Sequence, residues 1–354
     1  MPDDESYEAS LARALAVFEP KAKQGAIAAA KAPTNVGASE LARVADALDA
    51  QHAPGTRRTY NSAWKSFEMW CKRDQHASMP AHPGTITLYL SERASLPEAD
   101  AMHASIPYLR LSLAAIAQKH AERFPYEIPP THAPAVAQVM EGLTKKYGKP
   151  KTKKRGLMIE DFERMILAMP VETLLQLRDR TLLVVTYAMA GRRSEGIGLR
   201  MSYFTETKDG YSILLPKSKG DQIGEGQRID ISRNDARPHL CPVRALREWF
   251  VKGQPIDYVF ARPSGKPLDG AYIARLIKKY TAAIGLNPTI HSGHSLRRGH
   301  INQARRDGHS REDIRRKTRH VRDETLQEYY DDLGINEVDT SANLGTPVRK
   351  AEKK

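Results

Sequence analysis

Two pairs of side chains, each spaced three residues apart, have the chemistry of an anion-binding site. Arg192 and Glu195 lie in GRRSEGIGL, at the end of an apolar helical pattern, and His294 and Arg297 lie in HSLR. Residues at i and i+3 share a helix face, so each guanidinium group lies on the same face as its partner. An arginine at the end of an apolar helix is costly unless it is paired or faces an anion. Glu195 is close enough to orient Arg192.

A lysine, a late histidine and a tyrosine extend this set. Lys219, in LLPKSKGD, falls between the first two predicted β-strands, where a glycine-rich turn can carry its ammonium group into a neighbouring cleft. His320 precedes Tyr329 by nine residues. Nine helical steps of about 100° leave two side chains roughly half a turn apart, so His320 must precede the helix that carries Tyr329. Asp323 and Glu324 give that helix an acidic first turn, in agreement.

Ordinary structural roles also fit parts of this set. A lone lysine in a hairpin turn faces solvent in most proteins. One helical stripe, at i, i+3, i+4 and i+7, runs through Leu326, Tyr329, Tyr330 and Leu333. Such a stripe packs on a core, which predicts a structural role for at least one of the two tyrosines. The arginines between residues 305 and 322 fit a solvated face, or a face that binds a polyanion without chemistry.

The domain that must position these side chains is predicted over residues 157–334. Apolar periodicity predicts helices over residues 158–170, 172–190, 242–253, 270–285 and in the stretch 291–330, and the second is apolar enough to be central and buried. Short β-type segments are predicted over residues 201–206, 211–219 and 227–232, separated by hairpin signals. The domain is therefore expected to be α+β, mainly α with a small antiparallel β-sheet.

A separate all-helical domain is predicted over residues 36–148. Apolar periodicity predicts its helices in the regions of residues 41–48, 56–71, 86–96, 100–124 and 135–148. Residues 1–35 have weak periodicity and are predicted to be a flexible arm. Residues 149–156 are rich in Lys, Gly and Pro and are predicted to be a basic linker. The polar tail 335–354 is expected to dock on another subunit or to stay loose.

Composition points to a polyanionic partner. At 354 residues the chain is long enough for two domains with separate cores. Its formal net charge of +13 makes nucleic acid the first candidate partner, because Lys and Arg neutralise phosphates. A generally basic soluble protein is the alternative that composition alone leaves open.

Several classes of protein are disfavoured by what the sequence lacks. Cys71 and Cys241 are far apart without a CxxC context, so neither a disulfide framework nor a cysteine zinc site is expected, and a reducing cytoplasmic compartment fits. A signal peptide and a bilayer-spanning apolar run are both missing, so we expect a soluble protein without membrane contact. His291, His300 and His309 have no HExxH motif or carboxylate cluster, so no metal or cofactor is expected. These three histidines are predicted to lie on helix surfaces or to contact phosphate.

The order and spacing of the candidate residues resemble the signature of the tyrosine recombinase (phage integrase) family. That signature is an arginine followed three residues on by an acid, a β-hairpin lysine, an H-x-x-R pair, a histidine or tryptophan, and a tyrosine nine residues after it. It is met here by Arg192, Glu195, Lys219, His294, Arg297, His320 and Tyr329. The resemblance covers residues 36–333, and TRRTYNSAWKSFEMWCKRD looks like part of the family's SAM-like core-binding domain.

The resemblance implies a two-domain DNA recombinase. The layout is similar to Cre-type recombinases, although His320 stands where Cre itself carries tryptophan. The helical core-binding domain and the catalytic domain would close as a C-shaped clamp around double-stranded DNA with a specific recombination site. The protein would be a monomer or dimer when free and a homo-tetramer on DNA, with strand exchange through a Holliday junction.

For the individual residues the resemblance implies a transesterification without metal or ATP. Arg192 and Arg297 would clamp the phosphate, because guanidinium forks neutralise charge on its nonbridging oxygens. Tyr329 has a free pKa near about 10 and attacks only when its proton is removed or its oxyanion is stabilised. It would form a 3′-phosphotyrosyl intermediate and release a 5′-hydroxyl.

The remaining residues take supporting roles in this scheme. Lys219 suits the general acid for the leaving 5′-oxygen, and His294 suits the base for Tyr329. Glu195 suits an orienting residue, and His320 can donate a hydrogen bond to the phosphate.

Other interpretations stay open from the sequence. Tyr330 neighbours Tyr329, and only the spacing from His320 prefers the first tyrosine. A type IB topoisomerase-like or telomere-resolving enzyme would use the same groups. A catalytically silent DNA-binding architectural or regulatory protein would keep the scaffold, although the presence of every signature residue argues against it.

Overall fold

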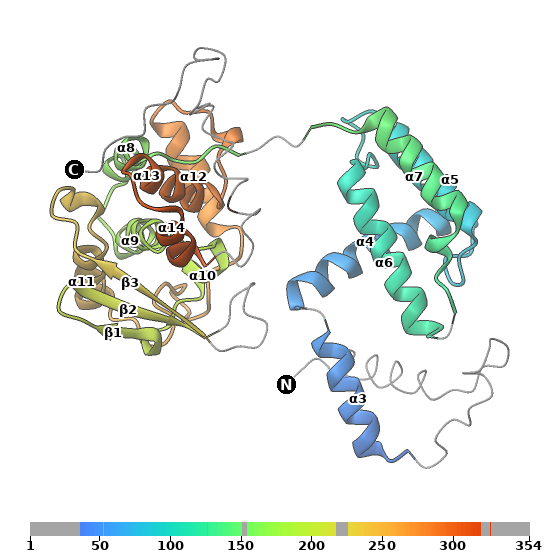
Figure 1. Ribbon diagram of the computed structural model, residues 1–354, viewed down its shortest axis with the longest axis horizontal. Coiled ribbons are helices and arrows are strands. Elements are labelled where there is room, and N and C mark those ends of the chain that lie inside the picture. Colours follow the sequence, from blue (N-terminus) through green and yellow to red (C-terminus); the bar gives the residue numbers. More distant parts are fainter. Residues whose placement is uncertain are drawn as a thin grey trace, which may run out of the picture. The chain divides into compact units, whose positions relative to one another are not determined.

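The computed structural model divides the chain into two units, Met1–Lys151 and Thr152–Lys354 (Figure 1). The structure describes residues 36–51, 53–125, 127–150, 154–216, 226–319 and 326, so the predicted arm and tail lie outside the described residues. Helices dominate both units, and the second also has a three-stranded antiparallel sheet. The predicted fold class is therefore confirmed, while the closing of the two units around DNA stays a prediction.

Helices make up the described part of the first unit. They are α3 (Ala38–Ala50), α4 (Pro54–Arg73), α5 (Pro83–Ser95), α6 (Ile106–Arg123), the 3-10 turn η1 (Pro130–His132) and α7 (Pro134–Tyr147). The last four α-helices have proline in the first turn, where its missing N–H removes no helical hydrogen bond. None of the described helices has the length and apolar character needed to cross a membrane.

One predicted helix of this unit starts later than expected. The pattern predicts a helix from Asp100, but α6 begins at Ile106. Asp100 instead accepts a hydrogen bond from the Met102 N–H (2.7 Å) in a preceding turn. Pro107 lies in the first turn of α6, because proline fits the first turn of a helix and not its interior.

Aromatic side chains form the centre of the first unit's core. Phe67 and Trp70 of α4 lie edge-on to Tyr89 of α5, with ring centroids 5.2 and 5.4 Å apart, and all three are buried. His120 of α6 accepts a hydrogen bond from the Ala81 N–H at Nε2 (2.9 Å). These contacts hold α4, α5 and α6 together.

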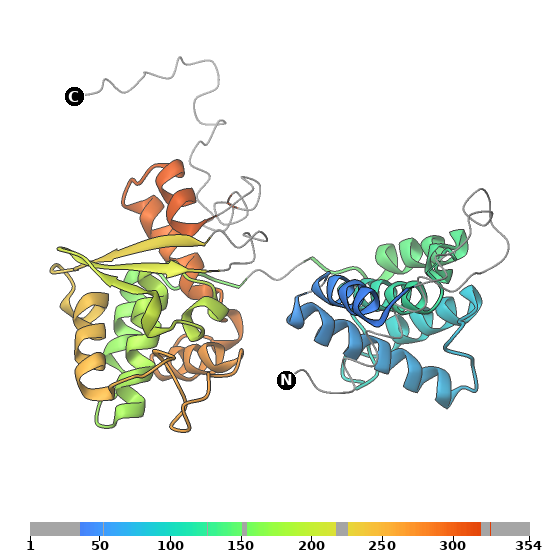
Figure 2. The same ribbon diagram turned by 90° about the horizontal axis from the view of Figure 1, so that it is seen from below.

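The second unit combines the sheet with helices. Its elements are α8 (Ile159–Leu167), α9 (Leu174–Ala188), α10 (Arg193–Ile197), η2 (Met201–Tyr203), β1 (Phe204–Glu206), β2 (Gly210–Leu215), β3 (Gln227–Ser232), η3 (Pro238–Leu240), α11 (Pro242–Gly253), α12 (Tyr272–Ala283), η4 (Pro288–Ile290), α13 (Ser295–Arg306) and α14 (Arg311–Thr318). The sheet order is β1-β2-β3, with Phe204 opposite Ile213 and Ile213 opposite Ile229. α11 packs against β3 and α9, below the sheet in the view of Figure 2.

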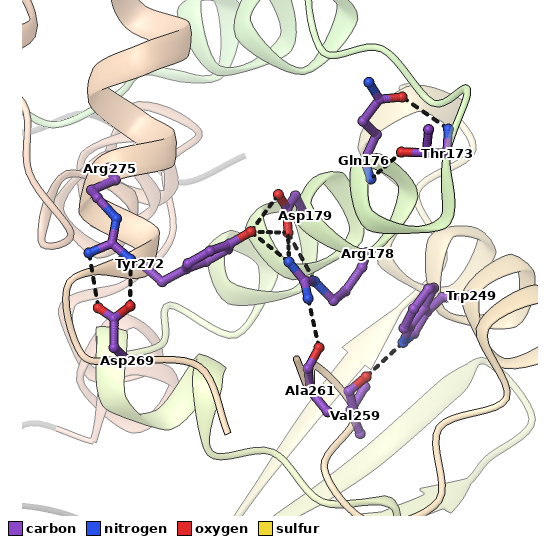
Figure 3. Close-up of polar contacts among 10 residues, drawn as sticks. All are labelled: Thr173, Gln176, Arg178, Asp179, Trp249, Val259, Ala261, Asp269, Tyr272 and Arg275. Carbon is purple, nitrogen blue, oxygen red and sulfur yellow. Dashed lines mark hydrogen bonds and ion pairs between the residues drawn. The ribbon is translucent and has the colours of Figure 1, made fainter. Parts of the chain in front are cut away.

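Helix α9 is the central element of this unit, and a polar network fixes it (Figure 3). α9 packs against α10, α11 and α13. Arg178 donates to the Ala261 carbonyl (2.7 Å) and to the Tyr272 hydroxyl (2.6 Å), and that hydroxyl donates to Asp179 (2.8 Å). Trp249 of α11 donates to the Val259 carbonyl (2.7 Å). The position of α9 is therefore set from α11, from α12 and from the loop between them.

Candidate active site

The end of α9 turns sharply into the segment that carries Arg192. Ala190 has a left-handed backbone conformation (φ 46°), which is uncommon for a residue with a Cβ. The Gly191 N–H donates to the Thr186 carbonyl (2.9 Å) and closes the turn. Arg192 is then the residue directly before α10. The position of α9 therefore determines the position of the Arg192 backbone.

Glu195 accepts hydrogen bonds from Arg192 at both carboxylate oxygens. The Arg192 N–H donates to Oε2 (2.7 Å), and its Nη1 donates to Oε1 (2.8 Å). The Glu195 side chain is 6% exposed, whereas that of Arg192 is 20% exposed. The buried carboxylate thus orients a guanidinium group that keeps access to solvent.

Arg297 reaches the same turn from α13. Its side chain is fully buried, and Nη1 donates to the Ala190 carbonyl (2.7 Å). Its Nη2 donates to the carbonyl of Thr318, the last residue of α14. The two arginines that the sequence pairs with Glu195 and His294 are therefore brought to one place in the fold.

His294 directly precedes α13, and the residue is exposed. Its pKa lies below the usual value, first because neighbouring protein atoms desolvate the ring. The positive charges of Arg297, Arg193, Arg298 and Arg192 lower it further. A neutral imidazole that can accept a proton is therefore favoured at neutral pH.

Arg319 joins this cluster, a contact that the sequence analysis did not predict. Its Nη2 donates to Glu195 Oε2 (2.7 Å), and its side chain is 3% exposed. The sequence pattern predicts that Arg319 lies on a basic face exposed to solvent or DNA. This prediction is wrong, because Arg319 is buried. The two partners lie 124 positions apart in the chain, so no local spacing could reveal the pair.

The residues before Arg319 attach α14 to other elements. Lys317 donates to the Asp230 carbonyl of β3, and burial lowers the pKa of Lys317 to about 8. Thr318 donates from Oγ1 to the Ile314 carbonyl (2.6 Å) within α14, while its own carbonyl accepts from Arg297. Three successive residues at the end of α14 thus contact β3, α13 and α10.

Three predicted site residues, Lys219, His320 and Tyr329, lie outside the described residues, as does Tyr330. The segment that holds Lys219 connects β2 to β3, so it follows the second strand and not the first as predicted. The paired strands β1 and β2 both end before Lys219 in the sequence, β2 at Leu215. Leu326, first in the predicted tyrosine stripe, is fully buried in a cluster with Ile301 and Ile314.

The histidines set aside from the site lie in different surroundings. His291 is buried and not on a helix surface. His300 lies edge-on to Tyr187 of α9, with ring centroids 5.7 Å apart. His309 is exposed. Among the described residues, no group of three or more His, Cys, Asp or Glu side chains is arranged to hold a metal ion.

We expect His300 to make stability fall in acid. Burial lowers its pKa from 6.5 to about 3, and the charge of Lys317 adds to the effect. Between these two values the unfolded chain binds a proton that the folded chain does not, so the free energy of unfolding decreases as pH falls through this range. His300→Gln should flatten that dependence in urea titrations measured at several pH values. His309→Gln is the matched control, and an equal flattening by it would contradict the assignment.

Comparison with known proteins gives a consistent result. The model of the phage integrase family matches residues 157–334, half of the chain. An integrase/recombinase xerD homolog of Selenomonas ruminantium is 28% identical over 296 residues, which cover 81% of this chain and 84% of the relative.

Solved structures share the fold at low sequence identity. A post-cleavage complex of the XerH site-specific recombinase with a palindromic difH substrate is 15% identical, covers 96% of this chain and 97% of its own, and gives a TM-score of 0.56. A lambda integrase (75–356) dimer bound to a COC′ core site is 17% identical, covers 84% of this chain and 96% of its own, and gives a TM-score of 0.56. These likenesses support the same mainly helical fold with a small sheet.

Proposed function

The chain belongs to the phage integrase family, and from this premise we propose that it recombines DNA through Tyr329, with Arg192 and Arg297 binding the phosphate under attack. As a tyrosine recombinase it cleaves and rejoins DNA at specific sites. One observation carries the residue assignment. Arg297 donates to the carbonyl of Ala190, 107 positions away and two residues before Arg192. Two guanidinium groups at one turn suit a phosphodiester whose nonbridging oxygens gain charge during attack.

The chemistry follows from these groups. The Tyr329 oxygen attacks the phosphorus, the bond to the 5′-oxygen breaks, and a 3′-phosphotyrosyl bond replaces it. His294 accepts the tyrosine proton, which its lowered pKa allows, and Lys219 gives a proton to the leaving 5′-oxygen. The covalent bond conserves the phosphodiester energy. Attack by a 5′-hydroxyl from another strand then reverses the step without ATP.

The first unit has a surface suited to the DNA backbone. A groove of about 1200 Å³ is lined by residues that include Arg57, Arg58, Asn61, Lys65 and Tyr108. Lysine and arginine along a groove neutralise phosphates, while asparagine and tyrosine add hydrogen bonds. We assign this groove to double-stranded DNA beside the cleavage site. Assembly of four subunits on two sites is part of the same proposal.

A nicked suicide duplex tests the function. The duplex carries a binding site selected from a randomised library and loses its 5′-hydroxyl strand on cleavage, so the covalent intermediate accumulates. We expect an SDS-stable protein–DNA adduct through the 3′ end and a free 5′-hydroxyl that a polynucleotide kinase can label. No adduct on a verified binding site would overturn the enzymatic function. Relaxation of any supercoiled plasmid would favour the topoisomerase-like alternative, and hairpin ends the telomere-resolving one.

Lys65→Ala should weaken DNA binding in a salt-dependent manner. Lys65 is exposed on α4 and lines the groove. Loss of one phosphate contact should reduce the slope of log Kd against log salt by about 0.9, whatever the DNA sequence. Fluorescence anisotropy over a salt series measures this slope. Lys145→Ala removes the same charge from α7, where Lys145 pairs with Glu141 at 2.6 Å, and an equal change there would remove the groove from the proposal.

A further inference from the structure

Two consecutive residues at the end of α14 contact one arginine of the proposed phosphate clamp and the carboxylate that holds the other. The Thr318 carbonyl accepts a hydrogen bond from Arg297. The next side chain, Arg319, donates to Glu195 Oε2 (2.7 Å), and the other oxygen of Glu195 accepts from Arg192 (2.8 Å). One turn of backbone therefore holds one arginine directly and the other through a carboxylate.

The backbone conformation of Arg319 shows that its contact with Glu195 has an energetic cost. Its backbone is left-handed (φ 58°, ψ 44°), a conformation that ends helices and favours glycine or asparagine. Its side chain is nonetheless long, charged and 3% exposed. Burial of a guanidinium is unfavourable unless an opposite charge offsets it. Glu195, itself 6% exposed, supplies that charge.

The two carboxylate oxygens of Glu195 accept hydrogen bonds from different donors. Oε2 lies between the Arg192 N–H and Arg319 Nη2, both at 2.7 Å, and Oε1 faces Arg192 Nη1. Two donors on Oε2 fix the plane of the carboxylate, and that plane sets the direction of the Arg192 guanidinium. Without Arg319, the buried Glu195 carboxylate would keep only its hydrogen bonds from Arg192.

We propose that Arg319 is a positioning residue for DNA cleavage, which anchors Glu195, and through it Arg192, to the end of α14. The inference rests on the proposed function, in which Arg192 binds the phosphate. Arg319 does not itself contact the reacting atoms in this assignment.

The protonation of Glu195 provides a readout that simple loss of folding would not give. Burial by itself raises the pKa of Glu195, but the charges of Arg319 and Arg192, with the hydrogen bonds from Arg192, bring it below the usual value. Removal of Arg319 removes the largest of the lowering causes. The pKa should then rise, and Glu195 should become protonated as the pH falls, which weakens its hold on Arg192.

The test uses single-turnover adduct formation on the suicide duplex from about pH 5 to about pH 8. Asparagine tolerates the left-handed conformation, so Arg319→Asn should fold while it loses the ion pair. We expect adduct formation to slow by roughly 10–100-fold at neutral pH and to slow further in acid relative to wild type. Arg319→Lys keeps the charge and should recover a large part of the rate. With Glu195→Gln already present, Arg319→Asn should add little.

Arg316→Asn is the matched control, because Arg316 lies in α14 with a side chain that is 73% exposed. It should change the rate by less than about twofold. A wild-type rate and pH profile in Arg319→Asn would overturn the proposal, as would a loss in Arg319→Lys equal to that in Arg319→Asn. Slowing by the same factor at every pH, with a matching loss of folded protein by circular dichroism, would also overturn it. Absence of an adduct from the wild-type protein would instead reject the underlying function.

Discussion

Tyr329→Phe should abolish the covalent protein–DNA adduct and leave DNA binding unchanged. Phenylalanine keeps the aromatic ring but removes the oxygen that is proposed to attack the phosphorus. The rate of adduct formation should fall by at least about 10⁴-fold. SDS gels of the suicide reaction measure the adduct, and anisotropy on the intact site measures binding.

Tyr330→Phe is the control for this prediction, because it makes the same chemical change one residue further on. It should alter the rate by less than about threefold, since Tyr330 is predicted to pack and loss of one hydroxyl usually perturbs stability only modestly. The opposite pattern, with an adduct from Tyr329→Phe and none from Tyr330→Phe, would move the nucleophile to Tyr330.

Arg297→Lys should lower both the cleavage rate and the stability of the protein. Lysine keeps the charge but cannot form the two-pronged contact with the carbonyls of Ala190 and Thr318. Loss of one preorganised donor to a developing charge slows catalysis by roughly 10²–10³-fold. A buried carbonyl left without a donor costs about 1–3 kcal/mol. Single-turnover rates and urea denaturation measure the two effects.

Arg298→Lys provides the comparison for Arg297. Arg298 is also in α13, and it donates to the Lys154 carbonyl, away from the turn that precedes Arg192. Its replacement should leave the rate within about threefold of wild type. If Arg297→Lys behaved in the same way, Arg297 would be a structural residue and not part of the phosphate clamp.

Local spacing predicts the contacts that are local in the fold. Arg192 and Glu195 are three residues apart, at the N-cap and the third position of α10, so the local geometry of this helix start brings them together, and the structure has both hydrogen bonds between them. Apolar periodicity also predicts the helices of both units, because each helix buries one face. Boundaries are less predictable, as η2 and the late start of α6 illustrate, since turns and prolines override the periodic pattern.

Contacts between distant segments could not be predicted in this way. Arg319 belongs to a run of basic residues, and nothing in that run distinguishes it from exposed neighbours such as Arg316. Its burial follows from the left-handed turn after α14 and from the position of Glu195, both of which depend on tertiary packing. His291 is likewise buried, although its sequence pattern does not distinguish it from an exposed histidine.

The end of α14 has a mechanical consequence. Lys317, Thr318 and Arg319 hold the sheet, α13 and α10 in turn, so a displacement of this one turn would break all three contacts together. Packed elements of this kind change between discrete arrangements and do not deform gradually. The polypeptide that continues from Arg319 leads to His320 and Tyr329. The clamp is thus expected to behave as an all-or-none assembly, in which displacement of this turn would remove the hydrogen bond from Arg297 to Thr318 and the ion pair that anchors Glu195 at the same time.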